Sequence, residues 1–232
     1  MKECIILAGG LGTRLQSVVK DVPKCMAEVA GNPFLKYIFD YLAKQDFQHI
    51  VLALGYKSEI ILDWIEQQDY PFEISYVIEE TPLGTGGAIK LAFSQIKEDS
   101  AIVVNGDTYF DIDSVALFNF HKSHKAILSL ALKPMVDFDR YGSVELDGNN
   151  RIIKFNEKQR CSKGLINGGI YVVEKSLFSK FNLPEKFSFE KDVMESKIND
   201  IGIYGCIQDS YFIDIGIPSD FEKANKEFLQ WK

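Results

Sequence analysis

Strand-length apolar runs alternate with amphipathic helical patterns in the first half of this chain, and that alternation restricts the fold more than any other feature. The runs are continuous in Ile, Val and Leu, as strands of a parallel sheet covered on both faces require. Helical segments between them supply the crossover connections that parallel strands need. We therefore expect an α/β fold with a mixed, mostly parallel central sheet. The runs cover residues 4–8, 50–54, 74–78, 101–104 and 127–132.

The expected helices carry apolar residues at helical spacing after recognisable start signals. Asn32 and Pro33 are typical of an N-cap followed by the first helical residue, and Ser58 is typical of a second cap. Further helices are expected over residues 86–95, 113–123 and 218–230. The buried face of the last one is predicted at Phe221, Ala224, Asn225, Phe228 and Leu229.

In the second half of the chain, short strand-like runs replace the alternation of strands and helices. Short strand-like runs over residues 142–146, 152–156 and 165–173 are separated by an Asp-Gly-Asn turn and a basic loop. These features favour antiparallel strands that extend the main sheet. No repeat, low-complexity tract or linker-like segment interrupts the sequence, so we interpret residues 1–232 as a single domain.

The charge balance and the cysteines exclude several classes of function. With 26 basic and 33 acidic side chains, the net charge is 26 − 33 = −7, which argues against a general nucleic-acid or membrane-surface binder. The four cysteines lack metal-ligand spacing and suit free thiols in a reducing compartment. The apolar run near residue 4 is too short for a secretory or transmembrane segment, so we expect a cytoplasmic protein.

A glycine-rich loop follows the first expected strand. Its glycines let backbone N–H groups close around a phosphate or a nucleobase, and the guanidinium of Arg14 matches phosphate oxygens; a plain tight turn is the alternative. The spacing does not fit a P-loop. Leu15 stands where a dinucleotide-binding fingerprint needs a third glycine, and no acid ends the second strand, which excludes a dehydrogenase. The candidate nucleotide-binding residues of this loop are Leu7, Ala8, Gly9, Gly10, Gly12, Thr13 and Arg14.

Two further segments favour a phosphate or nucleotide ligand. Lys24 follows the glycine loop by ten residues and is interpreted as a second contact to the same phosphates, although a solvated charge is the alternative. A second glycine cluster after the third strand opens a helix, and small residues there permit a planar base or an anion to approach closely. The candidate residues of this cluster are Leu83, Gly84, Thr85 and Gly87.

Two carboxylates follow apolar runs at positions where strands end. Asp107 comes directly after the fourth strand, in Asn105-Gly106-Asp107, and Asp214 precedes a glycine and the last helix. A carboxylate at the end of an apolar strand needs a cation, and two such groups suit Mg²⁺ shared with substrate phosphates. Capping of the helix is the alternative for Asp214.

Three other features have a less specific meaning. Within a basic group at residues 154–163, Glu157 and Lys158 are the pair we single out, with the lysine facing a second phosphate. His121 and His124 are interpreted as an exposed helix face and not as a metal site. Phe187 and Phe189 leave room for an exposed apolar interface, and we interpret this segment as a candidate homodimer interface.

Taken in order along the chain, these motifs resemble those of the sugar-1-phosphate nucleotidyltransferases. The resemblance extends from residue 3 to about residue 225, and the opening ILAGGLGTRL with SVVKDVPKCMAEVAGNPFLKY is similar to the D-glycero-D-manno-heptose 1-phosphate guanylyltransferase group. It implies a Rossmann-like three-layer α/β/α nucleotide-diphospho-sugar transferase fold. Residues 1–125 would form the nucleotide-binding half and residues 126–232 the sugar-phosphate-binding half.

The resemblance also implies roles for the matching residues. Arg14, Lys24 and Asp107 would be catalytic, the two glycine segments would hold the nucleotide, and Asp107 and Asp214 would bind Mg²⁺. Glu157 would accept hydrogen bonds from sugar hydroxyls. The implied sugar-phosphate contacts are Asn105, Tyr141, Gly142, Glu157, Lys158, Asn167 and Gly168.

The implied reaction joins a sugar 1-phosphate to GTP, giving a GDP-sugar for surface polysaccharide and pyrophosphate, with D-glycero-α-D-manno-heptose 1-phosphate as the expected sugar. Two alternatives stay open. One is another substrate pair, such as mannose 1-phosphate with GTP or a hexose 1-phosphate with UTP or dTTP. The other is a non-catalytic nucleotide-sugar sensor, which loss of Arg14, Lys24 or Asp107 would favour; all three are present.

Overall fold

A computed structural model describes residues 2–10, 15, 19 and 21–231 of the chain. Within these residues nine strands form one sheet, whose main path runs β10-β9-β11-β6-β1-β4-β5. The strands are β1 Glu3–Leu7, β4 His49–Leu54, β5 Glu73–Ile78, β6 Ser100–Asn105, β8 Leu128–Phe138, β9 Ser143–Leu146, β10 Ile152–Phe155, β11 Cys161–Glu174 and β12 Ile203–Ile207. Short ladders join β2 Glu28–Val29 with β3 Asn32–Pro33 and β7 Thr108–Phe110 with β13 Phe212–Asp214.

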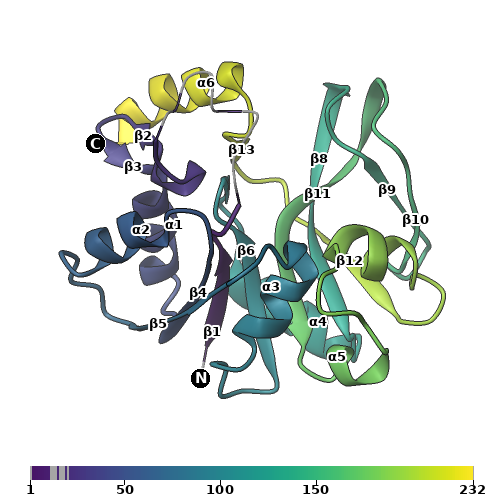
Figure 1. The fold of residues 1–232 in the computed structure, drawn as a ribbon. Helices are drawn as coiled ribbons and strands as arrows, with labels where there is room; N and C mark the ends of the chain where they lie inside the picture. Colours follow the sequence, from purple (N-terminus) through teal and green to yellow (C-terminus); the bar gives the residue numbers. More distant parts are fainter. Residues whose placement is uncertain (1, 11–14, 16–18, 20, 232) are drawn as a thin grey trace.

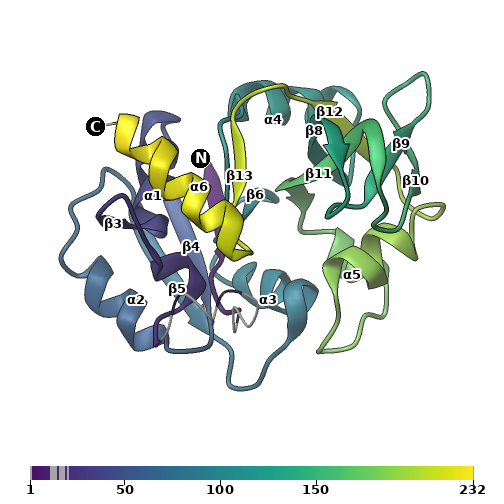
Figure 2. The ribbon, with the colours of Figure 1, turned by 90° about the horizontal axis from the view of Figure 1, so that it is seen from above.

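Helices cover both faces of this sheet (Figures 1 and 2). The apolar residues of β1 alternate between the two faces: Cys4 and Ile6 join one buried cluster, and Ile5 joins the other. The first cluster contains side chains of α1 Phe34–Lys44, α2 Ser58–Ile65, α4 Ser114–Ser123 and α6 Pro218–Phe228. The second contains those of α3 Gly84–Ala92, α5 Leu177–Lys180 and the π-helix η2 Phe189–Glu195. The expected three-layer α/β/α fold is confirmed.

The sheet is parallel at its centre and antiparallel where the second half of the chain joins it. Strand β1 pairs in parallel with β4 and β6, and β4 pairs in parallel with β5. Strand β11 runs antiparallel to β6, β8 and β9. The predicted antiparallel second half is therefore confirmed, and strands of both halves of the chain share one sheet.

The outer part of the second half projects beyond the central sheet. We call residues 133–167, which contain β9, β10 and the outer parts of β8 and β11, the arm. Figure 1 shows the arm at the upper right and α6 at the upper left, above the carboxyl ends of the central strands. The arm and α6 therefore flank the edge of the sheet where ligands of open α/β folds bind.

Two of the expected buried strands lie in other surroundings. Strand β5 is an edge strand, and Tyr76 and Ile78 are 50% and 45% exposed. The run over 127–132 is the inner part of β8, which pairs antiparallel with β11 and parallel with β12 instead of continuing the parallel core. Apolar composition alone does not distinguish a central strand from one with a single neighbour.

The helix starts differ from the predicted ones by two residues or fewer. Asn32 and Pro33 form β3, and α1 begins at Phe34, because the hairpin from Glu28 keeps the chain extended through Pro33. Ser58 is the first residue of α2 and Lys57, in the left-handed region, is its N-cap. The other helices begin at Gly84, Ser114 and Pro218.

The buried face of the last helix is also only partly as predicted. Ala224 and Phe228 are buried, but Leu229 is 58% exposed because the α-helix ends at Phe228. Asn225 accepts a hydrogen bond from the N–H of Ala30 through its side-chain oxygen, at 2.9 Å. The helix therefore packs through a narrower apolar stripe than the sequence pattern indicates.

The interpretation of His121 as part of an exposed helix face is wrong. Its ring is fully buried, with Nδ1 2.9 Å from Ser129 Oγ and Nε2 3.1 Å from Glu174 Oε1. His124 is half-buried, and its ring lies against those of Phe120 and Tyr204. Both histidines serve packing between α4 and the sheet.

The proposed interface at Phe187 and Phe189 is also wrong, since both rings are buried. Phe189 packs against Tyr171, and Phe187 packs against Gly86 of α3.

No helix of the described residues is long and apolar enough to cross a membrane. The four cysteines are free thiols, as expected.

A buried charged network ties the amino-terminal ends of the central strands together. Glu3 on β1 lies 2.6 Å from Nδ1 of His49 on β4, and Nε2 of His49 lies 2.9 Å from Ser75 Oγ on β5. The same carboxylate accepts hydrogen bonds from the N–H groups of Lys97 and Glu98. Burial works to raise the pKa of Glu3, but the hydrogen bonds from His49 and the two N–H groups outweigh it and lower that pKa.

Replacing Glu3 with alanine is expected to destabilise the fold by about 3 kcal/mol, because buried donors lose their acceptor. Because the pKa of Glu3 is lowered by folding, its carboxylate stabilises the fold fully at pH values above its unfolded-state pKa. This stabilisation is lost as the pH falls through the folded-state pKa. Urea unfolding at several pH values measures both effects. The control is Glu73→Gln, since Glu73 forms an exposed pair with Lys97 and the change should cost less than about 0.5 kcal/mol. Equal stability of the two variants would contradict this role of Glu3.

Candidate active site

Main-chain hydrogen bonds continue past the carboxyl ends of the central strands and fix the segments that follow. The N–H of Ala8 donates to Ala53 O at 2.9 Å, and the N–H of Gly106 donates to Leu7 O at 2.9 Å. The N–H of Glu79 donates to Leu54 O, also at 2.9 Å. The turns after β1, β4, β5 and β6 are therefore held side by side by the sheet itself.

These turns enclose a cavity of about 730 Å³. A Cβ on Gly55 would lie 2.9 Å from the carbonyl oxygen of Gly9, so the first two turns approach each other through glycines. The predicted residues in its wall are Leu7, Ala8, Gly9, Gly10, Lys24, Gly84, Thr85, Asn105 and Asp107. The wall also contains Cys25, Ala53, Gly55, Tyr56, Glu79, Glu80, Pro82, Ala88 and Gly106.

Part of the first glycine loop lies outside the described residues. Gly12, Thr13 and Arg14 belong to that part, so their predicted contacts to a nucleotide stay predictions. Gly9 and Gly10 lie on its amino-terminal side, and both line the cavity. The loop therefore leaves β1 at the wall of the cavity.

The second glycine cluster serves packing as much as access to the cavity. Gly84 and Thr85 line the cavity, whereas a Cβ on Gly86 would lie 2.1 Å from the ring of Phe187. Gly87 faces the carbonyl oxygen of Glu185 and the side chain of Leu83. The cluster is glycine-rich mainly because the segment before η2 packs closely behind it.

Thr85 joins this cluster to η2 through its hydroxyl group. Its Oγ1 donates to Glu190 Oε2 at 2.7 Å and accepts from the N–H of Phe189 at 2.9 Å. The N–H of Gly86 also donates to the carbonyl oxygen of Phe187. The second half of the chain therefore supports the loop that lines this side of the cavity.

The two candidate metal ligands meet at one lysine. Lys24 Nζ lies 2.5 Å from Asp107 Oδ2, and a Cβ on Gly216 would lie 3.0 Å from Lys24 Nζ and 2.7 Å from Asp214 Oδ1. The adjacent ladder pairs Asp214 with Thr108, the residue after Asp107. Burial raises the pKa of Asp214 and the charge of Asp107 adds to this effect, while Lys24 opposes it.

This donor set fits a hard divalent cation. Carboxylate oxygens are the protein ligands that Mg²⁺ prefers, and it commonly uses only one or two of them, with substrate phosphates and water completing its shell. In the described part of the chain no three His, Cys, Asp or Glu side chains are grouped as a metal site. Asp107 and Asp214 would therefore hold a cation together with a phosphate ligand.

Strand β11 is irregular where it contains two predicted sugar-phosphate residues, Asn167 and Gly168. The next residue, Gly169, lies against the end of β6. The pairing of β11 with β8 is irregular between Asn167 and Tyr171, and Gly169 there has φ +73°. A Cβ on Gly169 would lie 2.9 Å from Asn105 Nδ2, while one on Gly168 would meet the ring of Phe110. Asn167 accepts from the N–H of Gly169 and donates to the hydroxyl of Tyr171 at 3.1 Å.

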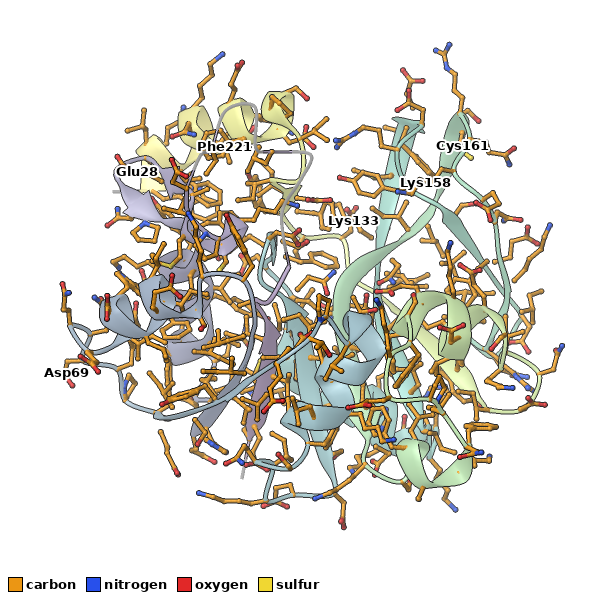
Figure 3. The ribbon with its side chains drawn as sticks, in the orientation of Figure 1. Glu28, Asp69, Lys133, Lys158, Cys161 and Phe221 are labelled. Atoms are coloured by element: carbon orange, nitrogen blue, oxygen red, sulfur yellow. The ribbon has the colours of Figure 1, made fainter. Side chains whose placement is uncertain are left out.

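The remaining predicted sugar-phosphate residues lie on the arm. Tyr141 is half-buried, and burial raises its pKa, with the charge of Asp214 adding to the effect. Gly142 approaches the carbonyl oxygen of Asn156 so closely that a Cβ would lie 2.6 Å from it. Glu157 and Lys158 follow Asn156 and are exposed, outside the cavity wall. In Figure 3, Lys158 lies on the arm and Phe221 on α6, with Lys133 between them.

Glu79 is the main residue of the cavity that the sequence analysis missed. Its Oε2 accepts from the N–H of Leu83 at 2.7 Å, and its Oε1 lies 3.0 Å from where a Cβ on Gly9 would stand. Burial raises its pKa, while the N–H of Leu83 opposes that shift. A carboxylate directly after an apolar strand was the signal used for Asp107, and the same signal is present here.

Comparison with known proteins identifies the family. Residues 3–230 match the nucleotidyl transferase family, and the chain belongs to it. It is 50% identical over 229 residues to the D-glycero-alpha-D-manno-heptose 1-phosphate guanylyltransferase of Aneurinibacillus thermoaerophilus, covering 99% of each chain. The enzyme of the same name from Campylobacter jejuni is 48% identical over 94% of this chain and 96% of its own.

A solved structure supports the same relationship. The HddC protein of Yersinia pseudotuberculosis complexed with GMP-PN is 38% identical, with a TM-score of 0.88 over 98% of this chain and 100% of the other. The recognition of the family from the motifs and the expectation of its fold are both confirmed.

The packing of the second glycine cluster gives a testable expectation. Gly86→Ala should destabilise the fold by about 1–3 kcal/mol, because the added methyl group would overlap the ring of Phe187. Gly10→Ala is the control, since a Cβ there meets no atom of the described residues within 4 Å. Urea unfolding of both variants measures the difference. A Gly86→Ala variant as stable as the control would show that Phe187 does not require this glycine.

Proposed function

We propose that this chain is a guanylyltransferase that joins D-glycero-α-D-manno-heptose 1-phosphate to GTP and releases pyrophosphate and GDP-heptose. The proposal rests on the family, on the names of the two relatives about 50% identical over nearly the whole chain, and on the chemistry of the cavity. Residues 1–125 would bind the nucleotide and residues 126–232 the sugar phosphate, as one domain. The free thiols suit a cytoplasmic reaction.

The observation that carries the choice of nucleotide is the carboxylate of Glu79 in the cavity wall. Guanine presents two adjacent donors on one edge, its N1–H and its 2-amino group, and a carboxylate can accept from both. Uracil and thymine present a single N–H between two carbonyl oxygens, which a carboxylate would repel. Adenine presents an acceptor where guanine has N1–H. The cavity is therefore complementary to GTP.

The reaction needs no activated protein nucleophile. An oxygen of the sugar 1-phosphate, already anionic at neutral pH, forms a bond to the α-phosphorus of GTP. The bond from that phosphorus to the oxygen bridging to the β-phosphate breaks, and pyrophosphate leaves with the electron pair. What the protein must supply is position and compensation of the negative charge.

Lys24, Lys158 and Arg14 are the groups we assign to charge compensation, with Asp107 and Asp214 holding Mg²⁺. A bound Mg²⁺ would neutralise phosphate charge and orient the reacting groups. Lys24 lies in the cavity wall beside Asp107, where its ammonium would meet the phosphates of the nucleotide. Lys158 is exposed on the arm and would meet the phosphate of the sugar.

Pyrophosphate release across a grid of nucleoside triphosphates and sugar 1-phosphates with Mg²⁺ tests the proposed function. We expect release with GTP and D-glycero-α-D-manno-heptose 1-phosphate, and none from Asp107→Asn with the same pair. Release with another pair would keep the reaction and replace the substrates. Binding of nucleotide without release from any pair would favour the sensor.

The role of Glu79 predicts a change in base preference. Glu79→Gln should raise the KM for GTP by roughly 10- to 100-fold, because it loses charge-assisted hydrogen bonds to guanine. It should also reduce the preference for GTP over ITP, which lacks the 2-amino group. Since the pKa of Glu79 is raised, the KM for GTP of the parent protein should rise as the pH falls from neutrality.

Steady-state kinetics with both nucleotides at several pH values measure these effects. Glu73 is exposed and begins the strand that Glu79 follows, so Glu73→Gln is the matched control and should leave them unchanged. An unaltered ratio of GTP to ITP in Glu79→Gln would remove Glu79 from base recognition.

A further inference from the structure

An ion pair ties the arm to the first turn of α6. Arg140 lies between β8 and β9, Asp220 lies in α6, and Arg140 Nη2 donates to Asp220 Oδ2. The two residues are 80 positions apart in the sequence. Their side chains are 35% and 22% exposed, so the pair is more protected from solvent than the other arginine pair of the arm, Arg160 with Asp137.

The same guanidinium group fixes Tyr141. Arg140 Nη2 donates to the hydroxyl of Tyr141 at 3.0 Å, and the guanidinium carbon lies 5.2 Å from the centre of its ring. The ring of Tyr141 also packs edge-on against that of Phe212, with 5.9 Å between the centroids. Phe212 begins β13, which ends at Asp214, so Tyr141 is held against the strand that carries a candidate metal ligand.

The restraint continues from Tyr141 to the exposed pair Glu157 and Lys158. Gly142 lies against the carbonyl oxygen of Asn156, and the N–H of Asn156 donates to Ser143 O at 2.8 Å. Asn156 directly precedes Glu157. Movement of the loop at residues 139–142 would therefore carry both groups of predicted sugar-phosphate contacts with it.

We propose that Arg140 and Asp220 are positioning residues that form a latch between the arm and α6. The latch holds Tyr141, Gly142, Glu157 and Lys158 at the separation from Asp214 that a sugar 1-phosphate needs. This assignment rests on the proposed function. A four-residue loop without the latch would be free to adopt other conformations, and sugar phosphate would have to order it on binding.

The geometry assigns this role to the pair rather than to Arg140 alone. Asp220 compensates the guanidinium charge, and Arg140 uses the same nitrogen for Asp220 and for Tyr141. Removing either partner should therefore have the same consequence.

Steady-state kinetics of Arg140→Ala, Asp220→Asn and the double variant test the latch. Each single change should raise the KM for the sugar 1-phosphate on the order of tenfold. This is the lower end of the effect seen when a residue that supports a ligand-binding group is removed. The KM for GTP should stay unchanged, and the double variant should be no worse than either single one. The exchange Arg140→Asp with Asp220→Arg should recover part of the loss.

Arg160→Ala is the matched control, because its pair with Asp137 is also on the arm but is 82% and 77% exposed. It should change neither KM. If Asp220→Asn behaves like the parent protein while Arg140→Ala loses activity, Arg140 acts on the substrate directly and the latch is wrong. If both KM values rise together with a lower melting temperature, the pair has a general structural role and the latch is also wrong.

Hydrogen exchange of the free protein separates the latch from the proposed function. Arg140→Ala and Asp220→Asn should both speed exchange at residues 139–142 and 156–158 relative to β1 and β6, and Arg160→Ala should not. Unchanged exchange in both variants would overturn the latch even if the parent protein makes GDP-heptose. Absence of GDP-heptose formation by the parent protein would overturn the proposed function and leave the exchange result to decide the latch.

Discussion

The parallel hydrogen-bond ladder of β6, β1, β4 and β5 is the constraint on which the site depends. Its bonds continue beyond the strands, so that the turns starting at Ala8, Glu79 and Gly106 are fixed to neighbouring strands by main-chain groups. Parallel strands end at the same edge of a sheet, which brings these turns together without any side-chain contact. The cavity is therefore a consequence of the sheet, and the glycines only allow its walls to approach.

Charge is the second organising feature, and it connects the two halves of the chain. Lys24 and Asp107 come from the first half of the chain and Asp214 from the second. Because one ammonium group faces two carboxylates and Asp214 is buried, this cluster has less positive than negative charge. A cation with phosphate ligands would complete it. Arg140 and Asp220 act farther out, where they connect the arm to the helix that follows Asp214. The segment from Asp214 to Asp220 would thus serve both the proposed metal site and the proposed sugar-phosphate side.

Much of the fold and part of the site could be predicted because each rests on a local pattern. Continuous apolar runs predicted the central strands, and the segments that follow those strands predicted Gly9, Asn105 and Asp107. Lys24 was predicted from its position ten residues after the glycine loop, and all four residues line one cavity. The same rule applied to Glu79 would have found the carboxylate that we assign to guanine. The predictions failed where the same sequence pattern is compatible with two different environments. Whether His121 is buried and whether β5 lies at the edge of the sheet both depend on what packs against them, which the local sequence does not give.

By itself the sequence determined the alternation of strands and helices in the first half, the glycine loops and the family, because periodicity and short motifs depend on residues near one another in the chain. Tertiary structure alone decided which side chains meet. It placed Phe187 behind Gly86, Asp214 beside Lys24, and Asp220 on Arg140, across separations of 101, 190 and 80 residues. Such contacts arise from the sheet register and the path of the connections, and no local pattern of residues encodes them.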